Sequence, residues 1–142
     1  MDETIITSIS KRIENELYFK KFGMRLVNLQ QGRAVIEMVP GEDFVNIFGM
    51  IHGGAIFSLI DEAFQASCNS HGRVAVALNV NVTYHHPPAR GSTLRAESNE
   101  IYLANKTATY DIKVTDRNNT LIASCTALAY RKMEKLPFLD AD

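Results

Sequence analysis

The stretch Asn46-Ile-Phe-Gly-Met-Ile-His-Gly-Gly-Ala-Ile-Phe-Ser-Leu-Ile-Asp-Glu-Ala-Phe64 decides how the rest of the chain is arranged. Two adjacent glycines, Gly53 and Gly54, lead directly into an apolar segment that runs to about Asn69. A segment that is apolar on nearly all sides is usually enclosed by the rest of the protein. We therefore expect a buried central helix that begins at the glycines and carries Asp61 near its middle.

Length and charge limit the classes of function. The chain has 142 residues, the size of one domain, and a formal net charge of -1. It has no long run of like charges and no signal-peptide pattern, so we expect neither a nucleic-acid partner nor a membrane partner. Cys68 and Cys125 lie in apolar segments without metal-site or disulfide spacing, which favours a reducing, cytoplasmic setting.

The hydrophobic periodicity predicts an α+β fold. Over about residues 3–22 apolar residues recur at the intervals of an amphipathic helix. Strand-like patterns follow, on both sides of the central helix, at residues 24–30, 32–39, 74–84, 93–103, 107–115 and 120–132. Short connections among the late strands predict a mainly antiparallel sheet with the apolar helix on one face. We expect a single domain over residues 1–142, with its core at about 23–132 and a loosely held tail at 133–142.

The glycine pair and Asp61 are candidates for two halves of one catalytic site. The first turn of a helix presents unpaired N–H groups and the positive end of the helix dipole, and glycine lets a carbonyl oxygen approach them. Asp61 lies roughly 12 Å from Gly53 along the axis, at a helical rise of about 1.5 Å per residue. The two groups therefore cannot act on one carbonyl within a single chain. If they cooperate, Asp61 comes from an antiparallel second copy, which predicts a two-fold dimer with two equivalent sites.

Each candidate residue also has a structural interpretation. Asp61 is a potential general base or nucleophile, but it could equally belong to a solvated stripe with Gln65. His52 could place a polar group beside the carbonyl or simply occupy the start of the helix. Asn46 could donate its amide to the same carbonyl or shape a turn. Glu62 is expected to be structural or exposed.

The histidine and cysteine spacings do not indicate a metal site. His85 and His86 are adjacent at a strand end, so their side chains point to opposite faces. The sequence contains neither an H-E-x-x-H pattern nor paired C-x-x-C spacing. Matches to serine-hydrolase or phosphate-loop motifs would be forced. We expect no metal and no cofactor.

The spaced residues Asn46-x-x-Gly49-x-x-His52-Gly53-Gly54-x-x-Phe57-x-Leu59-x-Asp61-x-Ala63 resemble the signature of hotdog-fold acyl-CoA thioesterases of the phenylacetate-degradation (PaaI-like) group. The resemblance extends to the long strand ending in Asn81-Val-Thr-Tyr-His-His-Pro87 and to the restart at Gly91, over roughly residues 20–132. It implies a hotdog fold, in which an antiparallel sheet wraps around one long central helix and two subunits join their sheets edge to edge.

By position, the resemblance implies roles at a thioester. The Gly53 amide would polarise the carbonyl, and Asp61 of the opposite subunit would attack it or activate water, while Asn46 and His52 would orient or assist. Some relatives carry a serine or threonine that helps to position the water where this chain has Ala77. Another group, such as Asn79, would then take that role, or the detail of the attack would differ. Coenzyme A, as part of the substrate, would contact residues at the end of the long strand and in the following turns: Asn79, Tyr84, His85, Pro87, Arg90, Asn105 and Lys106. Of these, Arg90 and Lys106 either meet phosphates or are solvated surface charges.

The resemblance implies an acyl-CoA thioesterase that hydrolyses an aryl- or medium-chain acyl-coenzyme A, as a homodimer or a dimer of dimers. Two alternatives stay open. A non-catalytic acyl-CoA binding module would have no use for a buried charge at Asp61. A hotdog hydroxyacyl-thioester dehydratase would use a histidine and a carboxylate, but His52 lies with the glycine pair. The acyl group is not fixed, because the expected pocket residues accept an aromatic or an aliphatic chain: Phe44, Phe48, Ile51, Phe57 and Leu59, or their symmetry mates.

Overall fold

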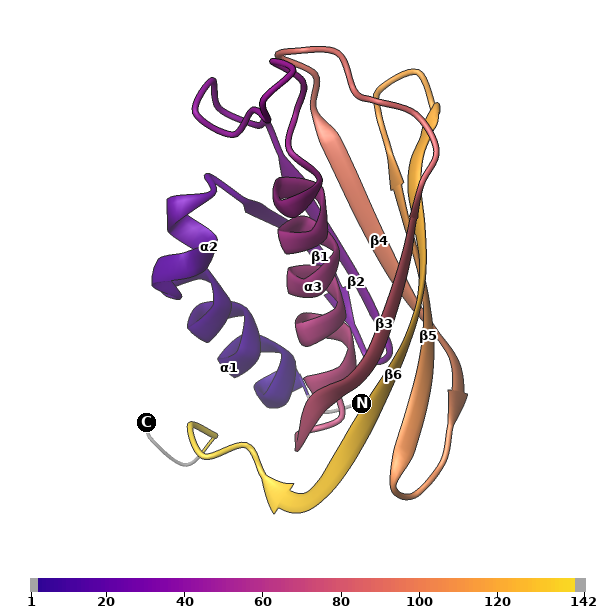
Figure 1. Ribbon diagram of the computed structural model, residues 1–142. Helices are drawn as coiled ribbons and strands as arrows, with labels where there is room; N and C mark the ends of the chain where they lie inside the picture. Colours follow the sequence, from indigo (N-terminus) through magenta and orange to yellow (C-terminus); the bar gives the residue numbers. More distant parts are fainter. Residues whose placement is uncertain (1–2, 140–142) are drawn as a thin grey trace.

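The central element of the fold is α3 (Gly53–Asn69), the helix that begins at the glycine pair. The structure is a computed structural model and describes residues 3–139. One six-stranded sheet curves around α3, in the order β1-β2-β4-β5-β6-β3, and all neighbouring strands are antiparallel (Figure 1). The other elements are α1 (Glu3–Glu14), α2 (Leu17–Lys21), β1 (Arg25–Gln30), β2 (Arg33–Met38), β3 (Arg73–Tyr84), β4 (Leu94–Leu103), β5 (Thr107–Thr115) and β6 (Leu121–Lys135). The predicted α+β hotdog fold is confirmed.

α3 packs against the sheet through large side chains that meet small ones. On the helix, Leu59, Ile60 and Phe64 are at most 1% exposed. The strands beneath present small buried residues, namely Ala96, Ala108, Ala123, Ala127 and Ala129. Small residues allow the helix axis to come close to the sheet, and burying each large side chain contributes about 1.5–3 kcal/mol to folding. α3 contacts all six strands, so it forms the centre of the core.

β3 is an edge strand, and its two faces differ from the simple alternation that the sequence predicts. It pairs only with β6, and the register shifts between Ala77 and Asn79, where Leu78 is the extra residue. A bulge of this kind reverses the alternation, because one residue is left without a partner. Before the bulge, Val76 lies opposite the exposed Tyr130 and is itself 42% exposed, so the alternating apolar residues of 74–84 do not form one continuous apolar face.

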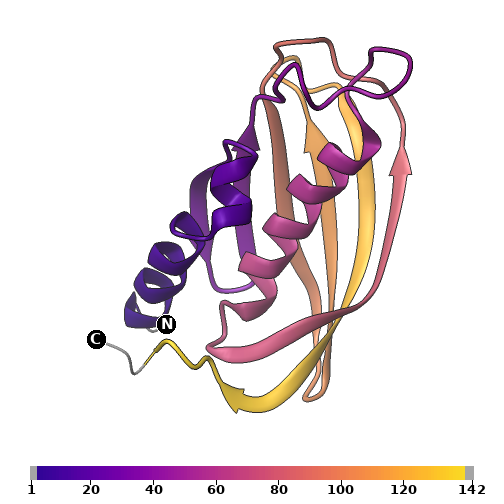
Figure 2. The same cartoon turned by 60° about the vertical axis from the view of Figure 1, so that its left-hand side comes forward.

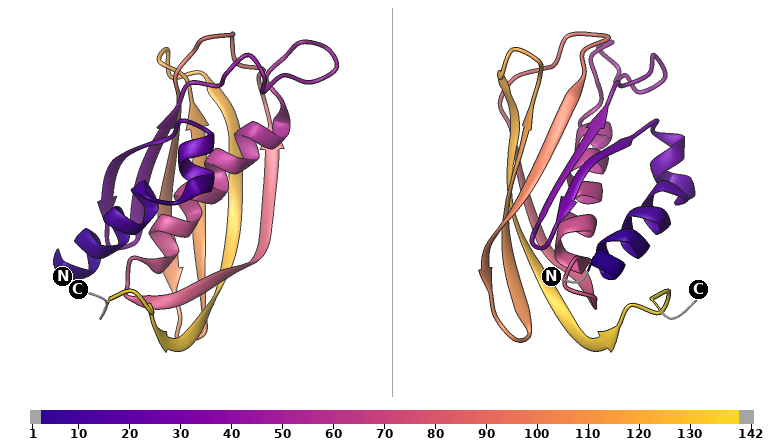
Figure 3. Two further views of the ribbon diagram at one scale, coloured as in Figure 1. Left: turned by 90° about the vertical axis from the view of Figure 1, so that its left-hand side faces the viewer. Right: turned by 180° about the vertical axis from the view of Figure 1, so that it is seen from behind.

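The predicted N-terminal helix is broken into α1 and α2, which lie beside α3 on the same side of the sheet (Figures 2 and 3). Glu16 adopts an extended conformation at the start of α2, and the Asn15 amide donates back to the Lys11 carbonyl at 2.8 Å. The break directs α2 toward α3, where the Tyr18 hydroxyl hydrogen-bonds the Ser58 hydroxyl at 2.7 Å. The packing of the two layers thus explains a break that periodicity alone does not reveal.

The C-terminal segment is held more firmly than the sequence predicts. β6 continues to Lys135, and Leu136 is only 4% exposed. The Leu136 N–H donates to the Gly72 carbonyl at 3.0 Å, and the Arg12 guanidinium lies over the Phe138 ring. The predicted loose tail is therefore wrong for residues 133–139, whereas 140–142 lie outside the described residues. Within residues 3–139, no helix is both long and apolar enough to span a membrane.

Candidate active site

α3 is buried on all sides except along one narrow stripe. Phe57, Asp61 and Gln65 are exposed and four residues apart, so they share one side of the helix. In Figure 1, α3 lies between the α1–α2 layer and the edge strand β3. The stripe is the one surface of α3 that a substrate or a second chain can reach, and Asp61 lies at its middle.

The environment of Asp61 makes its carboxylate more basic than an ordinary one. Partial burial against the helix layers raises the pKa of Asp61, and the negative charge of Glu16 raises this pKa further. Within residues 3–139, the Asp61 carboxylate accepts no hydrogen bond that would stabilise its charge. A carboxylate in this state is a better proton acceptor and a better nucleophile.

Glu62, expected to be structural or exposed, is a buried structural residue. It is 4% exposed, and its pKa is raised to about 9, first by burial and then by a hydrogen bond and charge repulsion with Glu16. The Gln65 amide donates to Glu16 at 3.0 Å and to Glu62 at 3.2 Å. We call Glu16, Glu62 and Gln65 the carboxyl cluster. It joins the start of α2 to α3 immediately beside Asp61.

His52 has the structural role that its position allows. It is the N-cap of α3, and its Nδ1 accepts a hydrogen bond from the Gly54 N–H at 2.9 Å. Because Nδ1 is an acceptor, the neutral ring carries its proton on Nε2. Among the described residues, the Gly53 N–H has no hydrogen-bond partner. The cap therefore uses the second glycine amide and leaves the first one available.

Asn46 shapes the loop that precedes α3. Its side-chain oxygen accepts from the N–H groups of Phe48 at 2.9 Å and Met50 at 3.1 Å, and its own N–H donates to the Met50 carbonyl at 2.7 Å. Gly49 has a φ of 75°, a conformation that glycine adopts without strain. The turn projects Ile47 and Phe48 into solvent, where they are 94% and 75% exposed.

The residues after β3 gather at the same end of the fold as the Gly53 amide. The Tyr84 hydroxyl donates to the Gly53 carbonyl at 3.0 Å. Arg90 donates two hydrogen bonds to the Gly49 carbonyl, from Nη2 at 2.8 Å and from Nε at 3.2 Å. His85 pairs with the Ser124 hydroxyl at 2.8 Å, and the exposed Pro87 follows it. The structure thus brings Tyr84 and Arg90 to the start of α3 and its preceding loop, and His85 and Pro87 lie at the same end of the fold.

The other predicted coenzyme A residues lie elsewhere. Asn105 and Lys106 form the β4–β5 turn at the opposite end of the sheet (Figure 1), where the Asn105 carbonyl accepts from Arg73 at 3.0 Å. Asn79 lies opposite Leu128, on the outer face of the sheet, and its side chain pairs with Asn81. Neighbouring ladder positions place Ala77 on the inner face. Asn79 therefore points away from α3 and does not replace the missing hydroxyl at Ala77 within the chain.

Residues 3–139 contain no cluster of three or more His, Cys, Asp or Glu side chains that could hold a metal ion. The candidate reacting groups are a helix N-terminus with a free Gly53 amide and the Asp61 carboxylate with its raised pKa. Such groups can polarise a carbonyl and attack it, or can activate water against it.

Comparison with known proteins places this arrangement in a family. Residues 48–123 match the thioesterase superfamily. An Archaeoglobus fulgidus protein named "Putative esterase" is 40% identical over 124 residues, which cover 87% of this chain and 80% of the relative. The acyl-coenzyme A thioesterase PaaI of Escherichia coli is 30% identical over 118 residues, which cover 83% of this chain and 84% of PaaI. The solved structure of E. coli PaaI superposes with a TM-score of 0.89 at 27% identity and covers 94% of this chain and 96% of that one. The chain therefore belongs to the thioesterase superfamily and has the hotdog fold of its PaaI-like members.

Proposed function

We propose that this chain hydrolyses acyl-coenzyme A to a carboxylic acid and free coenzyme A, and that each active site is formed by two subunits. Membership of the thioesterase superfamily supports thioester hydrolysis as the class of reaction. One observation carries the proposal for the site: a free Gly53 N–H and the exposed Asp61 lie on one helix, eight residues apart. They complement each other only when a second α3 lies antiparallel.

The edge strand β3 supports such a pairing. The outer edge of β3 pairs with no other strand within residues 3–139, and Leu78, a residue of β3, is 57% exposed. A long edge strand with exposed apolar side chains favours pairing with another chain. Antiparallel pairing of two β3 strands would reverse the ends of the partner, and it would bring the partner's Asn105 and the partner's Lys106 toward Tyr84 and Arg90. The two separated groups of predicted coenzyme A residues would then meet across the dimer.

The chemistry follows from the two half-sites. The Gly53 N–H donates to the thioester oxygen, on which negative charge develops as the carbonyl carbon becomes tetrahedral. The partner's Asp61 then acts in one of two ways. As a nucleophile it bonds to the carbonyl carbon, the carbon–sulfur bond breaks, the thiolate of coenzyme A leaves, and water hydrolyses the resulting anhydride. As a general base it takes a proton from water, whose oxygen attacks instead.

The inner face of β3 favours attack by Asp61 itself. In the middle of β3, the positions that face α3 are Ala77 and Val80, whose side chains have no group that could hydrogen-bond a water molecule. Ser58, one turn before Asp61, already donates to the Gly54 carbonyl at 2.9 Å and pairs with Tyr18. Attack by the carboxylate needs no ordered water in the first step.

Replacement of Asp61 with Asn tests the reaction. Release of free thiol is measured across aryl-, short- and medium-chain acyl-CoAs for the wild type, for Asp61→Asn and for the exposed control Glu14→Gln. We expect Asp61→Asn to keep its fold and bind coenzyme A but to lose turnover at least a hundredfold, and we expect the control to match the wild type. Retained hydrolysis in Asp61→Asn would exclude the proposed role.

The same assay separates the alternatives. A wild type that binds coenzyme A tightly but releases no thiol from any acyl-CoA would be a binding module. Loss of water from a hydroxyacyl-CoA without thiol release would identify a dehydratase.

A further inference from the structure

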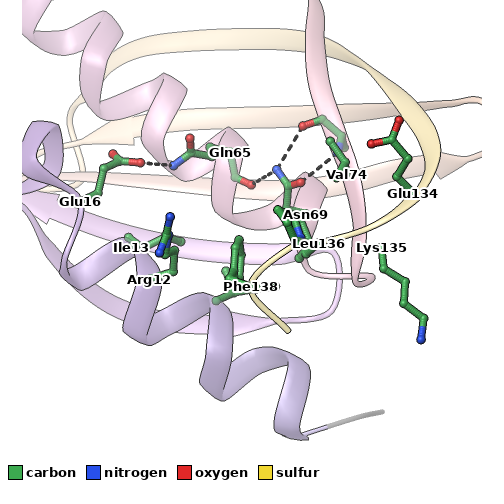
Figure 4. A pocket seen from close by; sticks show the side chains of 13 residues that line it. Arg12, Ile13, Glu16, Gln65, Asn69, Val74, Glu134, Lys135, Leu136 and Phe138 are labelled. Carbon is green, nitrogen blue, oxygen red and sulfur yellow. Dashed lines mark hydrogen bonds between the residues drawn. The ribbon is translucent and has the colours of Figure 1, made fainter. Parts of the chain in front are cut away.

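A cavity of about 520 Å³ lies at the C-terminal end of the exposed stripe of α3 (Figure 4). We call it the α1–α3 cavity. Its walls come from α1, the end of α3, the start of β3, and the end of β6 with the segment that follows it. Among the residues that line it are Ile13, Val74, Leu136 and Phe138, with Gln65 and Asn69 on the side of α3. This volume is within the range of small-molecule sites, about 300–1,000 Å³.

The polar groups that α3 contributes to the cavity already have their hydrogen bonds. Figure 4 shows Gln65 bonded to Glu16, and Asn69 bonded to the chain at the start of β3. The Asn69 amide exchanges two hydrogen bonds with the Ala75 backbone, at 2.9 Å and 3.2 Å, and donates another to the Gln65 carbonyl at 2.9 Å. These groups require no polar ligand, so the cavity suits an apolar one.

Charges at the rim do not favour an ionised ligand end. Two acidic side chains, Glu16 and Glu134, and two basic ones, Arg12 and Lys135, line the cavity. The Arg12 guanidinium lies over the Phe138 ring at 5.4 Å from its centroid. Because the two negative and two positive charges balance, a ligand whose inner end carries a carboxylate would gain no net attraction from the cavity. A methyl end fits better.

We propose that the α1–α3 cavity binds the acyl chain of the substrate, and that this acyl chain is a medium-length, unbranched aliphatic chain. The inference rests on the proposed function, because Asp61 determines where the thioester carbonyl lies. Gln65 and Asn69 follow Asp61 along one side of α3, at about 6 Å and about 12 Å. An extended chain advances about 1.2 Å per bond, so it reaches Gln65 after about five bonds and Asn69 after about ten. Chains of about eight to ten carbons therefore fill the cavity, and an acetyl group does not enter it.

The proposed two-fold arrangement also supplies a cover for the cavity. If the partner's Gly53 lies beside Asp61, the loop before the partner's helix extends over the next turns of α3, toward Gln65 and Asn69. That loop carries Ile47 and Phe48, which are 94% and 75% exposed in the single chain. Burial of these side chains over an acyl chain would remove apolar surface from water on both sides.

The experiment measures kcat/KM for thiol release with a series of straight-chain acyl-CoAs from acetyl to myristoyl, together with phenylacetyl-CoA. In the wild type, we expect kcat/KM to change little for chains too short to reach Gln65. Beyond that length it should rise about fourfold for each added methylene, up to about ten carbons. Val74→Phe fills the cavity, and it should lower the ratio of decanoyl to butyryl kcat/KM at least tenfold. Leu121→Phe, at the far end of β6, is the matched control and should leave the ratio unchanged.

Two further measurements keep the outcome decisive. Phe138→Ala enlarges the cavity and should move the optimum to longer chains, which covers the case in which Val74→Phe fails to fold. Binding of decanoyl-CoA and acetyl-CoA to Asp61→Asn, with and without Val74→Phe, should show the same selectivity without turnover. A length-independent kcat/KM, or a Val74→Phe variant with an unchanged ratio, would overturn the inference while leaving the proposed function intact. Failure of the proposed function itself would appear as retained hydrolysis by Asp61→Asn.

Discussion

Glu62→Gln should change how the stability of the protein depends on pH. Glu62 is 4% exposed and shares its environment with Glu16 and Gln65, which raises its pKa from 4.5 to about 9. Glutamine has nearly the same shape as protonated glutamic acid and keeps a donor and an acceptor for the carboxyl cluster. The substitution therefore preserves the packing and removes the titration.

Proton linkage gives the sign and the size of the expected change in the free energy of unfolding. Because the folded-state pKa of Glu62 is the higher one, its contribution to stability is complete below about pH 4.5 and is lost as pH rises toward about 9. In that window the folded state holds one proton more than the unfolded state, which costs about 1.4 kcal/mol per pH unit. Between about pH 5.5 and about pH 7.5, the free energy of unfolding of the wild type should fall by about 3 kcal/mol relative to Glu62→Gln.

Urea unfolding at several pH values measures this difference. Both proteins are compared at the same protomer concentration, because self-association would shift the apparent stability. The exposed Glu14→Gln is the control and should follow the wild type at every pH. Parallel stability curves for the wild type and Glu62→Gln would refute the assignment of a buried, protonated Glu62. So would a Glu62→Gln variant that loses stability relative to the wild type as pH rises.

Two other predictions concern catalysis. Proline suits the first helical position, and His52 before it has the extended φ of -65° and ψ of 135° that a following proline requires, so Gly53→Pro should fold. Gly53→Pro lacks the N–H donor and should lose about 10²–10³ in kcat. Gly53→Ala keeps the N–H, and its added Cβ would make only ordinary contact with Tyr84, so it should lose much less. The acid limb of the pH profile of kcat/KM should lie above the ordinary aspartate pKa of 3.8, because the proposed mechanism requires an ionised Asp61 and burial raises the pKa of Asp61. Glu16→Gln removes a neighbouring negative charge, so it should move that limb to lower pH; an unchanged limb would show that Asp61 does not control it.

The local pattern of the sequence is enough to predict the main elements. The central helix begins at Gly53 and ends at Asn69, as the glycine pair and the apolar run indicate. The alternating patterns locate all six strands, because strand period and helix period are local properties of the chain. The bulge at Leu78 was not predicted, since the register of an edge strand depends on its partner β6. The ordered position of Leu136 was not predicted either, since its N–H donates to the Gly72 carbonyl, which is distant in sequence.

In the candidate site too, local features were predicted from the sequence, whereas contacts between distant residues were not. The resemblance brought together Gly53, Tyr84 and Arg90, which the structure places at one end of the fold. The structure also shows the helix cap at His52 and the turn at Asn46. Both could be predicted from the sequence, because capping and turn formation involve residues that are close along the chain. The carboxyl cluster was missed, since Glu16 and Glu62 meet only through the packing of α1 and α2 on α3. The helical period alone could have predicted that Glu62 is buried, because Glu62 lies on the same buried side of α3 as Leu59.

Complementation in mixed dimers tests the central claim, that Gly53 and Asp61 act across two subunits. The Gly53→Pro and Asp61→Asn proteins are mixed, native mass spectrometry measures whether mixed dimers form, and thiol release is measured. In a mixed dimer, the Gly53 of one chain faces the Asp61 of the other in one intact site. Random exchange should therefore restore about a quarter of wild-type activity from two nearly inactive proteins, since half of the dimers carry one working site out of two. If mixed dimers form and activity stays at the level of the parents, the two groups do not cooperate between chains.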